Sequence, residues 1–253
     1  MSVAVFLDVD KTLTRRFIQQ EYAIAMGCEP AYKQLETRLG KDLSFDEFGE
    51  EIISLFASKK LNEEQARGYF DNVALQPWTH ELLELKVDTY LVSSGPSYYI
   101  DRLAEEYRIP KDHVCRPEYK FSRRDGIIES CNAISPQQKA DFVSQNAQRY
   151  TITVGVGDSP MFDGPFVSQC TIPLLTVQDN NYVYVPNFNS VVLMVRRLSE
   201  NIASGPGTFD PNQLTIPQLF RSLTVRGWAL LVSGFLAAGG VGAWAVKLFK
   251  LFR

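Results

Sequence analysis

Two aspartates directly after a short apolar run constrain the fold of this chain more than any other feature. The run Val3–Leu7 is rich in β-branched and aromatic residues and is followed at once by Asp8 and Asp10. An apolar run that stops abruptly at polar residues predicts a buried strand of an α/β sheet. Residues i and i+2 of a strand point to the same side, so both carboxylates can address one ligand beyond the strand's carboxyl end. Two such carboxylates repel each other unless a cation or a phosphate-handling site stabilises them, and an Asp-rich turn is the alternative interpretation.

Other parts of the chain carry comparable signals. A second apolar run, Thr89–Val92, is followed by polar or small residues, and these are Ser93, Ser94 and Gly95. A third run, Ile152–Val156, is followed by Gly157, Asp158 and, five residues later, Asp163. Between these runs, Ser135 and Pro136 predict the start of a helix that contains Lys139, because proline is favoured at the first helical position.

Each of these residues also has an interpretation without function. Ser93 could simply cap a helix, and Lys139 could be a solvated helix residue. The segment Gly157–Pro160 could be no more than a turn. A chain without a functional site at these residues would therefore require all of these interpretations to be correct at once, for residues that occur in this order along the sequence.

Taken in order, the four elements resemble the motifs of the haloacid dehalogenase superfamily. They are Asp-x-Asp-x-Thr-Leu-Thr, a strand-terminal Ser, a Lys, and Gly-Asp with a second Asp five residues later. The resemblance covers roughly residues 3–180 and implies an α/β fold, with a Rossmann-like parallel sheet and a small inserted helical cap like that of phosphoserine phosphatases. The position after Asp10, often Gly or Ser in the family, is Lys11 here, which leaves the carboxylates intact but alters the local charge.

The resemblance also implies a role for each residue. Asp8 would be the nucleophile that forms an aspartyl-phosphate, and Asp10 would be the general acid and base. Ser93 would donate a hydrogen bond to the phosphoryl group, helped by the backbone N–H groups of Ser94 and Gly95. Lys139 would offset the negative charge gathered there.

A Mg²⁺ cofactor is part of the same expectation. By resemblance, the ion would be held by the Asp8 carboxylate, the Asp10 backbone carbonyl and the Asp158 carboxylate. Asp163 would orient the waters bound to the metal. The presence of Asp10 favours phosphate chemistry, because the haloalkanoic acid dehalogenases of this superfamily lack the second acid and the metal.

The chain is predicted to have four parts. Helical patterns separate the first strand from the rest of the sheet, and glycines and prolines gather between residues 203 and 217. The predicted parts are a catalytic core of residues 1–14 and 76–200, a helical cap of 15–75, a linker of 201–225, and a transmembrane helix of 226–249 with a basic tail.

The membrane prediction depends on Trp228–Val246, which is 19 residues long and carries no charge. As a helix it would be about 28 Å long, enough for a hydrocarbon core of about 30 Å. A buried core helix and an in-plane amphipathic helix are the alternatives. The small residues Gly234, Ala238 and Gly242 recur every four positions, which leaves open a homodimer through this helix. Since the N-terminus does not resemble a signal peptide, a single-pass C-terminal anchor with the catalytic domain in the cytoplasm is expected.

The charge distribution limits the possible binding partners, and the cysteines indicate the redox environment. The net charge of the whole chain is −3, and the segment from residue 221 to the end has five basic residues and no acidic ones, which leaves −8 for residues 1–220. An acidic body argues against nucleic acid as a partner. Four cysteines without metal-binding spacing predict free thiols in a reducing cytosol, and these are Cys28, Cys115, Cys131 and Cys170.

The expected function is that of a membrane-anchored, Mg²⁺-dependent phosphatase acting on a small metabolite or a lipid-derived phosphate. Phe17 lies where phosphoserine phosphatases carry a Glu for the amino group, and the segment Phe48–Ile53 contains no Arg for the carboxylate, which argues against phosphoserine. Arg15 and Arg16 could bind an anionic group or be plain solvated surface. The alternatives are a soluble phosphoserine-phosphatase-like enzyme and a non-catalytic phospholigand-binding protein of the same fold.

Overall fold

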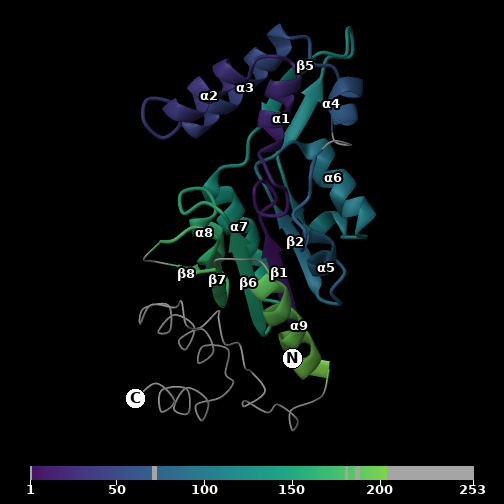
Figure 1. The fold of residues 1–253 in the computed structure, drawn as a ribbon, viewed down its shortest axis with the longest axis vertical. Coiled ribbons are helices and arrows are strands. Elements are labelled where there is room, and N and C mark those ends of the chain that lie inside the picture. Colours follow the sequence, from purple (N-terminus) through teal and green to yellow (C-terminus); the bar gives the residue numbers. More distant parts are fainter. Residues whose placement is uncertain (1, 70–72, 180–181, 186–188, 204–253) are drawn as a thin grey trace. The chain divides into compact units, whose positions relative to one another are not determined.

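A computed structural model describes residues 2–69, 73–179, 182–185 and 189–203 (Figure 1). The predicted transmembrane helix of residues 226–249 and nearly all of the predicted linker lie outside these residues. Within the described ranges, no helix combines the length and the apolar character needed to cross a bilayer.

Most of the described strands form one sheet, as the α/β prediction requires. A six-stranded sheet has the strand order β3-β2-β1-β6-β7-β8. Its strands are β1 (Val3–Leu7), β2 (Asp88–Val92), β3 (Val114–Cys115), β6 (Ile152–Gly157), β7 (Ile172–Leu175) and β8 (Val183–Tyr184). The pairings β2 with β3, β1 with β6, β6 with β7, and β7 with β8 are all parallel. The fold is therefore α/β with a parallel, Rossmann-like sheet.

The central strands are buried along their whole length. All five residues of β1 and all six of β6 are buried, and so are the four of β7. Continuous apolar runs are typical of parallel strands that are covered on both faces. This is why the runs at residues 3–7 and 152–156 could be recognised as strands.

Helices connect several of these strands along the chain. They are α1 (Ile18–Ala25), α2 (Glu29–Arg38), α3 (Phe45–Ser58), α4 (Glu63–Tyr69), α5 (Thr79–Leu83), α6 (Ser97–Glu106), the short 3₁₀ helix η2 (Lys111–His113), α7 (Pro136–Ala147), α8 (Gly164–Val167) and α9 (Asn189–Ala203). Helix α3 begins with a capping box, in which Ser44 Oγ accepts from Glu47 N and the Glu47 carboxylate accepts from Ser44 N. Each partner satisfies a backbone donor that the first helical turn leaves open.

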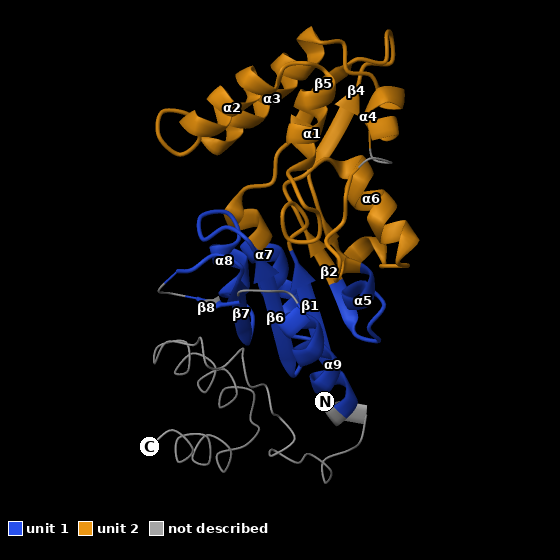
Figure 2. Ribbon diagram, viewed as in Figure 1, with its two compact units in different colours: residues 1–7, 80–89, 140–253 blue, residues 8–79, 90–139 orange. Residues whose placement is uncertain are grey.

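The chain divides into two compact units, coloured separately in Figure 2. The first unit contains residues 1–7 and 80–89 and the chain from residue 140 on. In it, α8 packs against β6 and β7, and α9 packs against β1. The second unit contains residues 8–79 and 90–139.

The second unit combines the predicted cap helices with an antiparallel hairpin. In this unit α2 contacts α1 and α3, and α3 packs against β5 (Ile128–Asn132), which pairs with β4 (Glu118–Phe121). The hairpin turn uses Gly126 at a φ of 69°, in the left-handed region that a tight turn requires. This hairpin lies in the same compact unit as the helices of residues 15–75.

Candidate active site

Asp8 and Lys139 form a buried ion pair. Asp8 directly follows β1, and Lys139 lies in the first turns of α7, whose predicted start at Pro136 is confirmed. The Lys139 Nζ is 3.1 Å from the Asp8 Oδ1, and the two side chains are only 2% and 5% exposed. Lysine is rarely buried unless it is paired, and removing two charges from water is expensive. An ion pair held in this environment therefore indicates a requirement for charge at this position.

The cap of α7 fixes where Lys139 lies. Ser135 Oγ accepts from Gln138 N at 3.2 Å, and Gln138 Oε1 accepts from Ser135 N at 2.9 Å. This reciprocal pair satisfies backbone donors at the start of the helix. Lys139 then follows one position after Gln138, with its own N–H bonded to the Ser135 carbonyl at 3.1 Å.

Asp158 and Asp163 lie in the loop that follows β6. The Asp163 side chain is almost fully buried, and its Oδ2 accepts the backbone N–H groups of Asp158 at 3.1 Å and Ser159 at 3.0 Å. Asp163 therefore holds the loop that carries Asp158. A Cβ at Gly157 would lie 2.4 Å from the Asp163 Cβ, so this approach requires a glycine.

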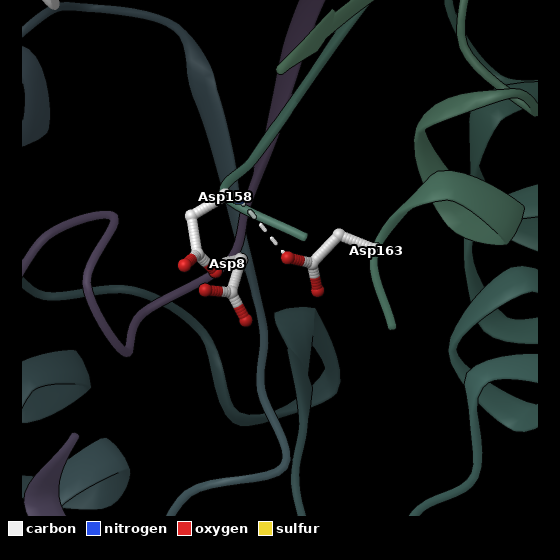
Figure 3. A group of neighbouring side chains, drawn as sticks. All are labelled: Asp8, Asp158 and Asp163. Carbon is white, nitrogen blue, oxygen red and sulfur yellow. Dashed lines mark hydrogen bonds between the residues drawn. The ribbon is translucent and has the colours of Figure 1, made fainter. Parts of the chain in front are cut away.

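Three carboxylates gather at the carboxyl ends of β1 and β6. Leu7 and Val156 are partners in the register of these strands, and Asp8 and Asp158 follow within two residues. Asp8, Asp158 and Asp163 each offer an oxygen within 4.8 Å of the others, and Figure 3 shows these side chains. Carboxylates this close repel one another, and the single Lys139 ammonium offsets only part of their charge.

The donor set fits a hard divalent cation. All the candidate ligand atoms are carboxylate oxygens, which Mg²⁺ prefers over nitrogen or sulfur. Asp163 Oδ2 accepts two backbone N–H groups of the loop that carries Asp158. Asp163 can therefore orient this loop around a bound ion.

Asp10 is held by the start of helix α1. Its Oδ1 accepts the N–H of Ile18, the first residue of that helix, at 2.8 Å. Its other oxygen, Oδ2, faces Gly95, where an added Cβ would lie only 2.3 Å away. Each oxygen of this carboxylate therefore has a defined neighbour, and only a glycine at position 95 leaves room for the second one.

The turn after Asp10 contains a lysine in a glycine-like conformation. Lys11 has a φ of 59°, and its N–H is donated to the Thr14 Oγ1 at 3.1 Å. A non-glycine residue in this region costs about 1 kcal/mol or more. The Lys11 Nζ lies 3.6 Å from the centre of the Phe17 ring, a cation–π contact.

Ser93, Ser94 and Gly95 follow the end of β2. Ser93 is fully buried, and its Oγ accepts the N–H of Gly95 at 2.9 Å. As an acceptor in that bond, the Ser93 hydroxyl keeps its own hydrogen for donation. The Ser94 hydroxyl donates to the Ile134 carbonyl at 3.1 Å, and α6 begins two residues beyond Gly95.

Sequence reasoning did not identify four buried tyrosines of the second unit whose pKa responds to the charge of Asp10. Burial raises the pKa of Tyr22, Tyr32, Tyr99 and Tyr119 well above the usual range, and the negative charge of Asp10 raises the pKa further. These phenols therefore stay neutral at any working pH. No local pattern marks such residues, because they come from segments far apart in the sequence.

Comparison with known proteins supports the same fold. No protein-family model and no curated protein sequence matches the chain. A haloacid dehalogenase family hydrolase from Salmonella enterica serovar Typhi matches in structure with a TM-score of 0.59 and 15% identity, over 70% of this chain and 63% of that chain. The chain thus spans less than two thirds of that hydrolase.

Two phosphoserine phosphatase structures are also similar. A probable phosphoserine phosphatase from Vibrio cholerae matches with a TM-score of 0.60 and 17% identity, over 80% of this chain and 67% of that chain. A phosphoserine phosphatase described as a phospho-aspartyl intermediate analogue matches with a TM-score of 0.58 and 18% identity, over 69% of this chain and 85% of that chain. The described part of the chain therefore has the haloacid dehalogenase fold in its phosphoserine-phosphatase-like form.

Proposed function

We propose that this chain is a Mg²⁺-dependent phosphatase that hydrolyses a phosphomonoester through an aspartyl-phosphate on Asp8. The observation that carries the proposal is the buried pair of Asp8 and Lys139, 3.1 Å apart, beside the carboxylates of Asp158 and Asp163. A structural ion pair needs one acid, whereas this position gathers three. An excess of carboxylates fits a site for a cation and a transferred phosphoryl group.

In the first step, an oxygen of the Asp8 carboxylate attacks phosphorus and the bond from phosphorus to the ester oxygen breaks. Asp10 gives its proton to the departing alkoxide, so that the products are an alcohol and an aspartyl-phosphate. Asp10 suits this role because the Ile18 N–H fixes one of its oxygens and leaves the other beside Gly95.

In the second step, Asp10 takes a proton from water, and the resulting hydroxide attacks phosphorus. The bond from phosphorus to Asp8 breaks, which releases inorganic phosphate and restores the carboxylate. During both steps the Lys139 ammonium offsets charge on Asp8, and the Ser93 hydroxyl donates to a phosphoryl oxygen.

Mg²⁺ would be held by the carboxylates of Asp8 and Asp158 and the backbone carbonyl of Asp10, with Asp163 orienting the surrounding loop. When bound, the ion supplies positive charge that neutralises the phosphoryl oxygens. The all-oxygen donor set supports this assignment.

The test is hydrolysis of p-nitrophenyl phosphate by the purified chain with Mg²⁺ and with EDTA. We expect Asp8→Asn to abolish the activity, because the neutral amide is not a nucleophile. Asp46→Asn is the matched control, since it removes the same charge from an exposed position in the first turn of α3. Equal rates for the unmodified chain and Asp8→Asn would refute the proposal.

We further propose that residues 226–249 anchor this phosphatase to a lipid membrane, with the catalytic part in the cytoplasm and a small metabolite or lipid-derived phosphate as its substrate. The support is the uncharged 19-residue segment Trp228–Val246. Flotation with phosphatidylcholine vesicles tests the anchor. The full chain should float with the vesicles and a chain ending at residue 220 should not, while equal behaviour of both would contradict the anchor.

A further inference from the structure

The loop from Asp10 to Ile18 is closed by two adjacent contacts. The Asp10 carboxylate accepts the Ile18 N–H at 2.8 Å, and one residue inward on each side the Lys11 ammonium lies 3.6 Å from the centre of the Phe17 ring. The residues of the second contact are thus adjacent in sequence to those of the first. Lys11 is therefore positioned by the same loop that positions Asp10.

The Phe17 ring holds the Lys11 ammonium without neutralising it. A cation–π contact restrains the position of a cation, but it leaves the full positive charge in place. Arg16 differs, because its guanidinium is paired with the Glu21 carboxylate at 3.4 Å. Within the part of the chain that the structure describes, the Lys11 ammonium contacts this aromatic ring, and Lys11 is exposed.

A second uncompensated cation follows in the same loop. Arg15 is exposed, and its Nε donates to the carbonyl of Leu75 at 3.3 Å, which is a neutral acceptor. Lys11 and Arg15 thus place positive charge in the same loop as Asp10, the carboxylate that serves the departing alcohol in the proposed reaction. Charge of this kind favours an anion and disfavours an ammonium group at that end of the substrate.

We propose that Lys11, held on Phe17, selects phosphomonoesters whose alcohol part carries a second anionic group. This inference rests on the proposed phosphatase function and names its substrate class. The ammonium binds the second anion as a point charge, while Asp10 serves the ester oxygen.

The left-handed backbone at Lys11 allows a substitution that tests the role of the ammonium without disturbing the turn. Lys11→Gly removes the ammonium and suits a φ of 59°, so the turn keeps its shape. Lys60→Gly is the matched control, because Lys60 is also exposed and has a φ of 58° after α3. Lys11→Arg keeps the charge and should keep the selectivity.

The probes are pairs of phosphomonoesters of equal length. One pair is 2-phosphoglycolate and 2-hydroxyethyl phosphate, and the other is 3-phosphoglycerate and glycerol 3-phosphate. We expect a higher kcat/KM for the carboxylate of at least one pair, with O-phosphoethanolamine slowest. Lys11→Gly should reduce the ratio of kcat/KM for the carboxylate to kcat/KM for the neutral ester about tenfold, because it removes one partly screened charge pair. Added salt should reduce the same ratio, because salt screens that pair.

The outcomes separate the inference from the proposed function. If Lys11 had a purely structural role, Lys11→Gly would lower kcat/KM equally for both members of a pair. An unchanged kcat/KM ratio in Lys11→Gly, or no preference for the carboxylate in the unmodified chain, overturns the inference. If nothing is hydrolysed, p-nitrophenyl phosphate included, the phosphatase proposal fails. Calorimetric titration of the same probes into Asp8→Asn then measures the preference without turnover. A preference for the carboxylate that Lys11→Gly removes supports the charge selection, and its absence overturns it.

Discussion

Replacing Gly95 with alanine should disable Asp10 while leaving the fold nearly intact. The new methyl carbon would lie 2.3 Å from the Asp10 Oδ2, 3.3 Å from its Cγ and 3.1 Å from the Ser93 Oγ. An ordinary contact between carbon and oxygen is about 3.4 Å, so the carboxylate oxygen must move by about 1 Å. Gly95 is not among the residues with positive φ, so alanine fits its backbone.

The structure indicates how this displacement divides between stability and activity. The clashing atom is the end of a side chain that can rotate, so the main structural loss is the 2.8 Å bond from Ile18 N to Asp10 Oδ1. Losing a hydrogen bond to a charged, partly exposed group lowers the free energy of unfolding by about 1–2 kcal/mol. Misplacing a catalytic group by about 1 Å reduces the rate about 100-fold, which corresponds to about 2.7 kcal/mol in the activation barrier.

The assay compares kcat/KM for p-nitrophenyl phosphate and for an alkyl phosphate, with Mg²⁺ present. Nitrophenolate is a good leaving group and needs little protonation, so the loss should be greater for the alkyl phosphate. Gly68→Ala is the control, because no atom lies within 4 Å of a Cβ at that glycine. If folded Gly95→Ala hydrolyses the alkyl phosphate as fast as Gly68→Ala does, the assignment of Asp10 as the general acid is refuted.

Further changes probe the charges and thiols of the same region. Lys139→Met leaves the buried Asp8 carboxylate without its 3.1 Å partner, so chemical denaturation in EDTA should show a loss of about 3 kcal/mol that added Mg²⁺ reduces; an unchanged unfolding free energy would contradict the buried pair. Asp163→Asn keeps an oxygen for the N–H groups of Asp158 and Ser159 but removes the charge, so Mg²⁺ affinity measured by calorimetry should fall with little change in Tm, whereas Asp163→Ala should lower both. Burial raises the pKa of the Cys115 thiol to about 11, although the nearby Lys139 charge lowers it in part. Iodoacetamide at pH 8 should therefore react with Cys115 at least about 100-fold more slowly than with free cysteine, and faster only as the pH approaches that pKa; rapid labelling of the folded protein would contradict this.

Local patterns predicted the elements of the fold well. The apolar runs at residues 3–7 and 152–156 are strands because their composition suits burial on both faces, and the Ser44 cap and the Asp125-Gly126 turn satisfy backbone requirements that are visible within a few residues. The antiparallel pairing of the β4–β5 hairpin was also predictable. Its grouping with α3 was not, because that packing joins segments about eighty residues apart in the chain.

The candidate site shows the same limit. Lys139 is of a type that is usually solvated, and no helical periodicity distinguishes it, so only the order of motifs suggested its pairing with Asp8. The close approaches of Gly95 to Asp10 and of Gly157 to Asp163 depend on tertiary geometry. The hydrogen bond from Ile18 N to Asp10 likewise depends on how the loop folds back, which residue types alone do not specify.

The account is tested most directly by trapping the covalent intermediate. The chain is mixed with a phosphomonoester and Mg²⁺, quenched with borohydride, digested and mapped by mass spectrometry. An acyl phosphate on Asp8 is reduced to homoserine, so the account predicts homoserine at position 8 and at no other aspartate. Hydrolysis of the ester with an unmodified aspartate at position 8, or with homoserine at a different position, would contradict it.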